Sequence, residues 1–331
     1  MRSAVRAAMG TGWFVRLVAR KRSGGNDAEL DRQVAAALEF QRIARMPALD
    51  SMEPVAAREY AEEGMSPLEL EPESMAEVID TRVGSPALPV RIFVPHDATP
   101  HWIVYFHGGG GVIGSIRGSE PVTRYLAART RCTVASVEYR LGPEDRHPAA
   151  IDDAHAAFRA LAARVPAGGR IAVAGDSFGG FLSVHVDHRT RRAHERGPDL
   201  QVLLYPIVDL TLTSPSIERF AAGYLLTESM MHWFRDNYLK PSDDPRDGSP
   251  QFWPDAELAG AAPAVVVTAG FDPLVVEGDA WARRLEAAHV RVRHRCERSL
   301  VHGFLSLAGA IDEARAATDR ICADIVELLD T

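Results

Sequence analysis

A chain of 331 residues with 46% hydrophobic and 25% charged side chains has a globular composition, which argues against a disordered or fibrous protein. Its net charge of −8 argues against a nucleic-acid partner, because proteins that bind nucleic acid concentrate positive charge on one face. The cysteines Cys132, Cys296 and Cys322 form no Cys-x-x-Cys site and no paired framework, so we expect a reducing, cytoplasmic setting.

The first 25 residues are basic and contain neither aspartate nor glutamate. Arg16 and Arg20 interrupt their apolar residues, so the segment lacks the unbroken apolar core of a signal peptide. No stretch of the chain is apolar for long enough to span a bilayer. Two alternatives stay open for residues 1–25. One is a helix in weak contact with a membrane or lipid surface, and the other is an amphipathic cap helix packed on the core.

Residues 28–62 have the periodicity of helices, and beyond residue 67 short apolar runs alternate with amphipathic stretches. The runs predict eight strands, at 77–82, 89–94, 102–107, 133–138, 171–176, 202–205, 264–269 and 290–295. Helices are expected at 119–129, 148–164, 178–195, 277–289 and 308–329. Alternating strands and helices predict an α/β protein with a mostly parallel sheet and helices on both faces.

The interval 208–260 breaks this alternation, because it is long, rich in proline and aspartate, and carries several aromatic residues. We interpret it as a cap inserted into the α/β core. The predicted organisation is therefore N-terminal cap helices at 1–65, core at 66–207, cap insertion at 208–260 and the rest of the core at 261–331.

The strand that ends at His107 is followed by Gly108, Gly109, Gly110 and Gly111. Glycines let backbone N–H groups turn inward and let a substrate oxygen approach them, as an oxyanion hole requires. We expect Gly109 and Gly110 to donate there, and His107 and Gly108 to shape the loop. The alternative, a phosphate-binding loop, would require a lysine that Val112-Ile113-Gly114-Ser115 does not supply.

Gly175-Asp176-Ser177-Phe178-Gly179 joins a short apolar strand to a helix. Gly-x-Ser-x-Gly in that setting predicts a nucleophile elbow, in which the serine takes a strained backbone and the glycines permit close packing. The N–H of Phe178 is then the third expected oxyanion donor.

An elbow serine requires an orienting acid and a base on later strand-end loops. Asp272 follows the strand at 264–269 and is the preferred acid, ahead of Asp279, Glu277 and Asp209. Among twelve histidines, His302 alone follows the last strand in a glycine-bearing loop, so we predict that it is the base.

A metal site is the alternative for other histidines. His185 and His188, with Asp187 between them, could form a metal pair on one helix face, but no third ligand is evident. We therefore expect neither a metal nor an organic cofactor.

Several ordered motifs resemble the hormone-sensitive-lipase-like branch of the α/β-hydrolases, including its bacterial carboxylesterases. The matching segments are 107–110, 139–144, 175–180, 272–274 and 302–304. The resemblance implies an α/β-hydrolase fold with a helical cap, a Ser177–His302–Asp272 triad and hydrolysis of a small-molecule ester. It leaves open whether the protein is a homodimer.

The sequence departs from that pattern where an aromatic residue, an alanine and an asparagine are usual. Gly111, Phe178 and Phe181 stand at those positions, and Val275-Val276 replaces a charged pair. We expect a reshaped pocket, with volume gained at 111, bulk added at 178 and 181, and Tyr224 contributed by the cap.

The predicted activity is hydrolysis of short- to medium-chain carboxylic esters through an acyl-enzyme on Ser177. An amidase or an N-/O-deacetylase would use the same triad on another acceptor. A non-catalytic ligand receptor on the same fold is a remoter alternative.

Overall fold

The protein is represented by a computed structural model, which describes residues 11, 15, 29–64 and 68–331. The alternatives for the basic segment 1–25 therefore lie outside the described residues, apart from Thr11 and Val15. Within the described part, no helix is both long and apolar enough to cross a bilayer.

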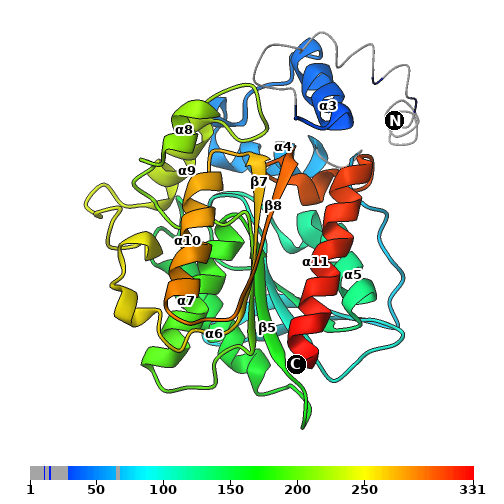
Figure 1. Ribbon diagram of the computed structural model, residues 1–331, viewed down its shortest axis with the longest axis vertical. Helices are drawn as coiled ribbons and strands as arrows, with labels where there is room; N and C mark the ends of the chain where they lie inside the picture. The colour runs from blue at the N-terminus through cyan, green and yellow to red at the C-terminus, as the bar shows by residue number, and fades with distance from the viewer. Residues whose placement is uncertain (1–10, 12–14, 16–28, 65–67) are drawn as a thin grey trace.

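A single eight-stranded sheet forms the centre of the molecule (Figure 1). The strand order is β1-β2-β4-β3-β5-β6-β7-β8, with β1 and β2 antiparallel to their neighbours and the others parallel. The strands are β1 Glu77–Val83, β2 Leu88–Val94, β3 Trp102–Phe106, β4 Thr133–Val137, β5 Ile171–Asp176, β6 Leu200–Leu204, β7 Ala264–Phe271 and β8 Val292–Val301. The predicted fold class is confirmed.

Helices cover both faces of the sheet, as the alternating pattern predicts (Figure 1). They are α5 Ile116–Thr130, α6 Ala149–Ala162, α7 Phe178–Arg192, α10 Val275–Ala287 and α11 Asp312–Asp330. α5 and α11 pack on one face, and α6, α7 and α10 pack on the other. Because the central strands β3 to β7 are buried on both faces, they are almost continuously apolar.

The last two strands are longer than the sequence predicts. β7 continues to Phe271 and β8 to Val301, past an irregularity in their pairing at Ala269 and Phe271. β8 is an edge strand with one partly exposed face, so it contains arginine, histidine and glutamate residues. These polar residues interrupt the apolar run from which the strand was predicted. The extension places Asp272 and His302 immediately after strand ends.

Two segments distant in sequence cover the carboxyl ends of the strands (Figure 1). The first contains α3 Arg32–Ile43, the 3-10 turn η2 Leu49–Ser51 and α4 Pro54–Gly64. The second contains α8 Pro215–Arg219 and α9 Glu228–Tyr238. The 3-10 turns η3 Pro250–Phe252 and η4 Asp255–Glu257 follow it and lie along α7, where Glu257 contacts His188. α9 contacts η2, so the two segments meet above the carboxyl ends of the strands. The exact domain boundaries stay a prediction.

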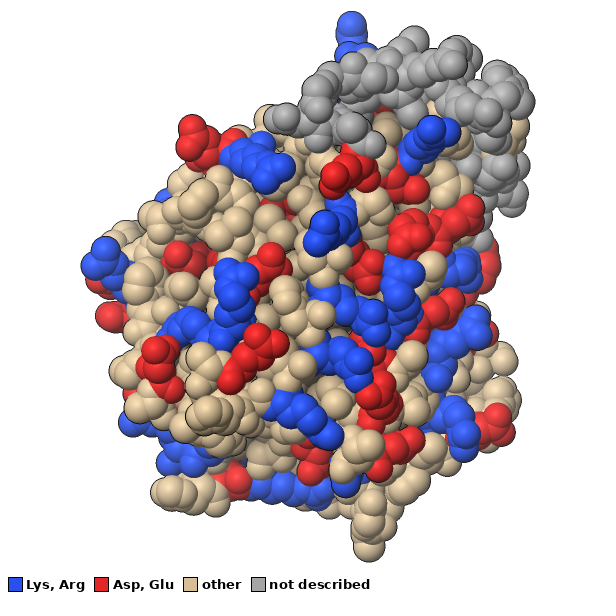
Figure 2. All heavy atoms as spheres, viewed as in Figure 1, with Lys and Arg blue, Asp and Glu red and all other residues tan. Residues whose placement is uncertain are grey.

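Charged side chains of both signs are interspersed on the face shown in Figure 2. Several form ion pairs across elements, as Arg320 does with Glu297 and Arg295 with Asp324. Salt screens the interactions of such exposed charges beyond about a Debye length, roughly 10 Å at 0.1 M salt.

Candidate active site

Ser177 stands between the last residue of β5 and the first residue of α7. Its backbone has φ 54° and ψ −113°, a conformation that non-glycine residues seldom adopt. A Cβ on Gly179 would overlap the carbonyl oxygen of Phe106, and a Cβ on Gly175 would overlap Gly179. The turn is therefore sharp, and Ser177 lines a pocket at the carboxyl ends of the strands.

The Ser177 side chain begins a chain of hydrogen bonds. Its Oγ is 2.9 Å from Nε2 of His302, and Nδ1 of His302 is 2.8 Å from Oδ2 of Asp272. Asp272 is fully buried, and its other oxygen accepts the N–H of Leu274 at 2.8 Å. With its Nδ1–H donated to Asp272, the imidazole presents an Nε2 lone pair to the serine. This arrangement can remove the serine proton during nucleophilic attack.

The rival acids have other partners. Asp279 accepts the hydroxyl of Thr268 at 2.8 Å and pairs with His294 at 2.9 Å. Asp209 accepts the hydroxyl of Thr211 at 2.6 Å.

Glu277 is buried, and its Oε1 accepts the N–H groups of Val208 and Asp209 at 2.8 and 3.2 Å. Burial raises the pKa of Glu277 well above its ordinary value of 4.5, because the charged form loses its hydration. Glu277 holds the chain after β6 in place.

The glycine loop after β3 is held by neighbouring side chains. The N–H of Gly108 and the hydroxyl of Tyr105 both donate to Oδ1 of Asp176, at 2.9 and 2.6 Å. The hydroxyl of Tyr139 donates to the carbonyl of His107 at 2.7 Å, and the Tyr139 and His107 rings stack with centroids 4.3 Å apart. Burial lowers the pKa of His107, so its imidazole is neutral and bonds Gly108 O through Nδ1 at 2.8 Å. His107 thus shapes the loop.

The backbone of the loop has an unusual course. Gly109, Gly110 and Gly111 have φ of 113°, 62° and 73°, values at which side chains are disfavoured. Gly109, Gly110, Ser177 and Phe178 line the same pocket. Because Phe178 is the first residue of α7, its N–H has no partner within the helix. The loop and the helix start can therefore offer N–H groups to an oxygen atom near Ser177.

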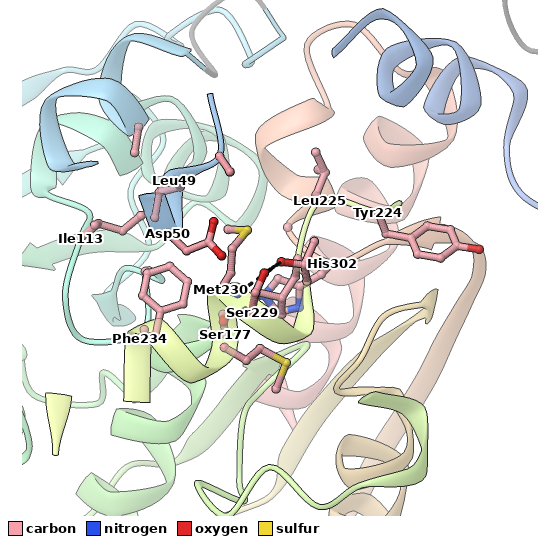
Figure 3. A pocket seen from close by; sticks show the side chains of 18 of the residues that line it. Leu49, Asp50, Ile113, Ser177, Tyr224, Leu225, Ser229, Met230, Phe234 and His302 are labelled. Carbon is pink, nitrogen blue, oxygen red and sulfur yellow. Dashed lines mark hydrogen bonds between the residues drawn. The ribbon is translucent and has the colours of Figure 1, made fainter. Parts of the chain in front are cut away.

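The pocket above Ser177 has a volume of about 580 Å³. Both cap segments and the core contribute to its walls, as Figure 3 shows. Besides Ser177 and His302, the labelled residues are Leu49 and Asp50 from η2, Ile113 from the core, and Tyr224, Leu225, Ser229, Met230 and Phe234 from the insertion. Mostly apolar walls of this kind suit an organic molecule of modest size.

The structure corrects the expected effect of the departures at 111, 178 and 181. A Cβ on Gly111 would lie 2.7 Å from Cζ of Phe178, so the Phe178 ring already fills the volume expected to be free. Phe178 and Phe181 stack with centroids 5.1 Å apart and are buried beside Tyr238. Of the three, only Phe178 lines the pocket, and Gly111 and Phe181 lie behind its wall. The departures compensate one another instead of enlarging the site.

Tyr224 lines the pocket at its margin (Figure 3). Its ring packs against Phe220 and Phe271, with centroids 5.4 and 5.7 Å away, and points away from Ser177.

The histidines considered for a metal have ordinary partners. His185 lies 3.2 Å from Gly248 O, and His188 lies 2.6 Å from Glu257. Asp187 pairs with Arg191 at 2.9 Å. No cluster with metal-ligand geometry occurs among the described residues.

Sequence reasoning missed two contributors to the site. Asp176 ties the glycine loop to the elbow, and its position directly before the nucleophile could have drawn attention to it. Asp50 enters the pocket from η2, and no sequence signal marks it because nothing local indicates which residues of the N-terminal cap face the site.

The chain is similar to known proteins in both sequence and structure. Residues 103–306 match the family described as alpha/beta hydrolase fold. The carboxylic ester hydrolase LipN of Mycobacterium tuberculosis is 40% identical over 71% of this chain and 66% of its own length. The ethyl acetate hydrolase of Pseudomonas putida is 35% identical over 74% of this chain and 80% of its own length.

A solved structure agrees with these matches. The alpha/beta hydrolase LAE6, from the metagenome of Lake Arreo in Spain, superimposes with a TM-score of 0.87. It is 33% identical, and the match covers 92% of this chain and 99% of LAE6.

Asp272→Asn is expected to lower kcat for ester hydrolysis by about ten thousandfold, because an amide leaves His302 in the wrong tautomer. Asp279→Asn is the matched control, since Asp279 is a rival acid on the following helix whose partners are Thr268 and His294. The measurement is steady-state kinetics on p-nitrophenyl butyrate. Equal losses in the two variants would contradict the assignment of Asp272.

Glu277→Gln is expected to change how stability depends on pH. The folded wild type keeps a proton that the unfolded chain releases near pH 4.5. Its free energy of unfolding should therefore fall as pH rises above that value, by at most about 1.4 kcal/mol per pH unit. The neutral glutamine should remove this decline, as urea unfolding across the pH range would show. Exposed Glu286 on the same helix provides the control, and an equal effect of Glu286→Gln would refute the explanation.

Proposed function

The chain belongs to the alpha/beta hydrolase fold family, in its hormone-sensitive-lipase-like branch, and on this premise we propose a specific activity. The protein is a serine carboxylesterase that hydrolyses short- to medium-chain carboxylic esters. The observation that carries the proposal is the hydrogen-bond chain from Ser177 through His302 to buried Asp272, at the base of a mostly apolar pocket.

The reaction follows from this geometry. Ser177 Oγ attacks the ester carbonyl while Nε2 of His302 takes the hydroxyl proton, giving a tetrahedral oxyanion. The N–H groups of Gly109, Gly110 and Phe178 stabilise the negative oxygen. Collapse of this intermediate breaks the bond to the alcohol oxygen, which leaves with the proton from His302. A water molecule then gives its proton to His302 and attacks the acyl-enzyme, and the acid is released as Ser177 regains its proton.

The names of the relatives favour esters over the alternatives. LipN is named a carboxylic ester hydrolase, and the Pseudomonas putida relative is named an ethyl acetate hydrolase. Neither an amidase nor a receptor is favoured by any observation on the site. A small-molecule ester is therefore the proposed substrate, while a cytoplasmic location and a homodimer stay predictions.

The acyl-length profile tests the proposal directly. We expect kcat/KM to be highest for p-nitrophenyl butyrate or octanoate and to fall steeply at palmitate, because a long acyl chain would have to coil, at an entropic cost, to stay inside a pocket of about 580 Å³. A matched anilide should react more slowly, and Ser177→Ala should lose about 10⁶-fold in kcat. An anilide hydrolysed faster than the esters, or an active Ser177→Ala variant, would overturn the proposal.

Asp50 should discriminate against anionic substrates. Its half-buried side chain projects into the pocket (Figure 3), and no ion pair holds it within the described part of the chain. Three arginines reach the rim: Arg42 and Arg235 are paired with Glu39 and Asp236, and Arg45 is exposed. A carboxylate inside the pocket repels a carboxylate on the substrate, by about 1 kcal/mol at 4 Å even in water.

Asp50→Asn should therefore raise kcat/KM for p-nitrophenyl hydrogen adipate about fivefold relative to the neutral hexanoate ester. Exposed Glu59, on α4 outside the pocket, supplies the control variant Glu59→Gln, which should leave the ratio unchanged. An unchanged ratio in Asp50→Asn would mean that Asp50 does not face the bound acyl chain.

A further inference from the structure

Hydrogen bonds hold the glycine loop at both of its ends, and one of the partners at the far end is a cap residue. At its near end, Gly108 is fixed by Asp176, as described above. At its far end, the carbonyl of Gly111 accepts the N–H of Gly142 at 2.7 Å. The next carbonyl, that of Val112, accepts Nε of Arg58 at 2.8 Å. Arg58 belongs to α4, so a cap residue contacts the loop that carries the proposed oxyanion donors.

The Arg58 guanidinium serves three acceptors at once. Besides Val112 O, it donates through Nη2 to the carbonyl of Gly142 at 2.8 Å. Its Nη1 and Nη2 also lie 3.0 and 2.6 Å from the two carboxylate oxygens of Glu144. A planar, charged fork holds such a set of acceptors in a fixed mutual geometry, which a lysine cannot do.

The two carbonyls depend on this arginine. Val112 and Gly142 are buried, and the described residues supply no backbone donor to either carbonyl oxygen. Losing Arg58 would leave two buried acceptors unsatisfied, which is a costly state that the loop would relieve by moving. The N–H of Gly142 also donates to the carbonyl of Gly111. A movement of either Val112 or Gly142 would therefore shift the glycine loop.

α4 contacts the substrate pocket as well. Tyr60 and Ala61, two and three residues after Arg58, line the pocket that contains Ser177. The helix lies over the carboxyl ends of the strands (Figure 1), between the pocket and the 142–144 loop. One helix therefore both borders the substrate and holds the loop that must receive its carbonyl oxygen.

We propose that Arg58 is a positioning residue for catalysis, through which cap helix α4 sets the geometry of the oxyanion hole. This inference rests on the proposed esterase function. Arg58 touches no reacting atom, and it acts by fixing Gly111 and Val112 so that the preceding N–H groups face the oxygen. It also gives the segment 139–144 a role, as the surface on which the cap arginine and the glycine loop meet.

The expected effect is on turnover more than on substrate binding. The oxyanion forms only after attack, so misplaced donors weaken the transition state and leave the bound ester largely unaffected. Because a shift of about 1 Å costs about a hundredfold and loss of one donor costs about a hundredfold to a thousandfold, Arg58→Met should lower kcat by about tenfold to a hundredfold. KM should change by less than about threefold, since the apolar walls are intact.

The test compares four variants with the wild type on p-nitrophenyl butyrate. Arg58→Met removes the fork, and Arg58→Lys retains the charge and should recover only part of kcat. Glu144→Gln should lose less than Arg58→Met, because Arg58 would still reach both carbonyls. Arg117→Met is the matched control, since Arg117 pairs with Glu62 of the same cap helix at 3.7 Å without contacting the loop. It should keep wild-type kcat.

A second measurement separates positioning from general damage. A trifluoromethyl ketone forms a tetrahedral oxyanion on an active serine, so its inhibition constant should rise in proportion to the loss of kcat in Arg58→Met. The rate of Ser177 labelling by a fluorophosphonate should fall as well. Thermal unfolding of each variant checks that it is folded. If Arg58→Met does not fold, Arg58→Lys and Glu144→Gln still test the inference.

The possible failures are distinguishable. If the wild type neither hydrolyses esters nor reacts with the fluorophosphonate, the proposed function fails. If the wild type is active but Arg58→Met keeps its kcat, or changes KM alone, the inference about Arg58 is wrong. An equal loss of kcat in Arg117→Met would also overturn it, because general attachment of the cap would then explain the effect.

Discussion

The close approach of two backbones at the centre of the sheet is the constraint on which the site depends. β3 and β5 are neighbours, and the turn from β5 into α7 passes against the end of β3, where Gly179 meets the carbonyl of Phe106. Any side chain at 179 would separate the two. This contact brings Ser177 and the glycine loop, which are almost 70 residues apart in sequence, together at the carboxyl ends of the strands. The strained backbone of Ser177 is compatible with folding because large buried clusters pack on both faces of the sheet that carries it.

Four carboxyl groups lie around the active site, and each has a different environment. Asp272 orients His302, and Asp176 links the elbow to the glycine loop. Burial raises the pKa of Glu277, whose carboxyl group accepts backbone N–H groups of the chain after β6. Asp50 instead faces the pocket without an ion-pair partner in the described part of the chain. The same functional group thus orients a histidine, holds the backbone or faces the pocket, according to its burial and its neighbours.

Local patterns in the sequence were sufficient for the fold class, because continuous apolar strands and intervening amphipathic helices leave few architectures. The Gly-x-Ser-x-Gly turn also predicted the sharp elbow at Ser177, and strand ends indicated where Asp272 and His302 would lie. Long-range compensation could not be predicted in this way. Nothing near Gly111 in the sequence indicates that the Phe178 ring fills the space beside it, and nothing near Arg58 indicates that it reaches Val112. These contacts depend on how the cap and the core meet, which periodicity does not encode.

The central claim is that turnover proceeds through an acyl group on Ser177. Rapid mixing of excess p-nitrophenyl butyrate with the enzyme, followed by acid quenching and peptide mass spectrometry, measures this directly. We expect a butyryl adduct on the peptide that contains Ser177, formed together with the first equivalent of p-nitrophenol and lost on further turnover. An adduct on a different residue that forms and decays at the rate of turnover would contradict it.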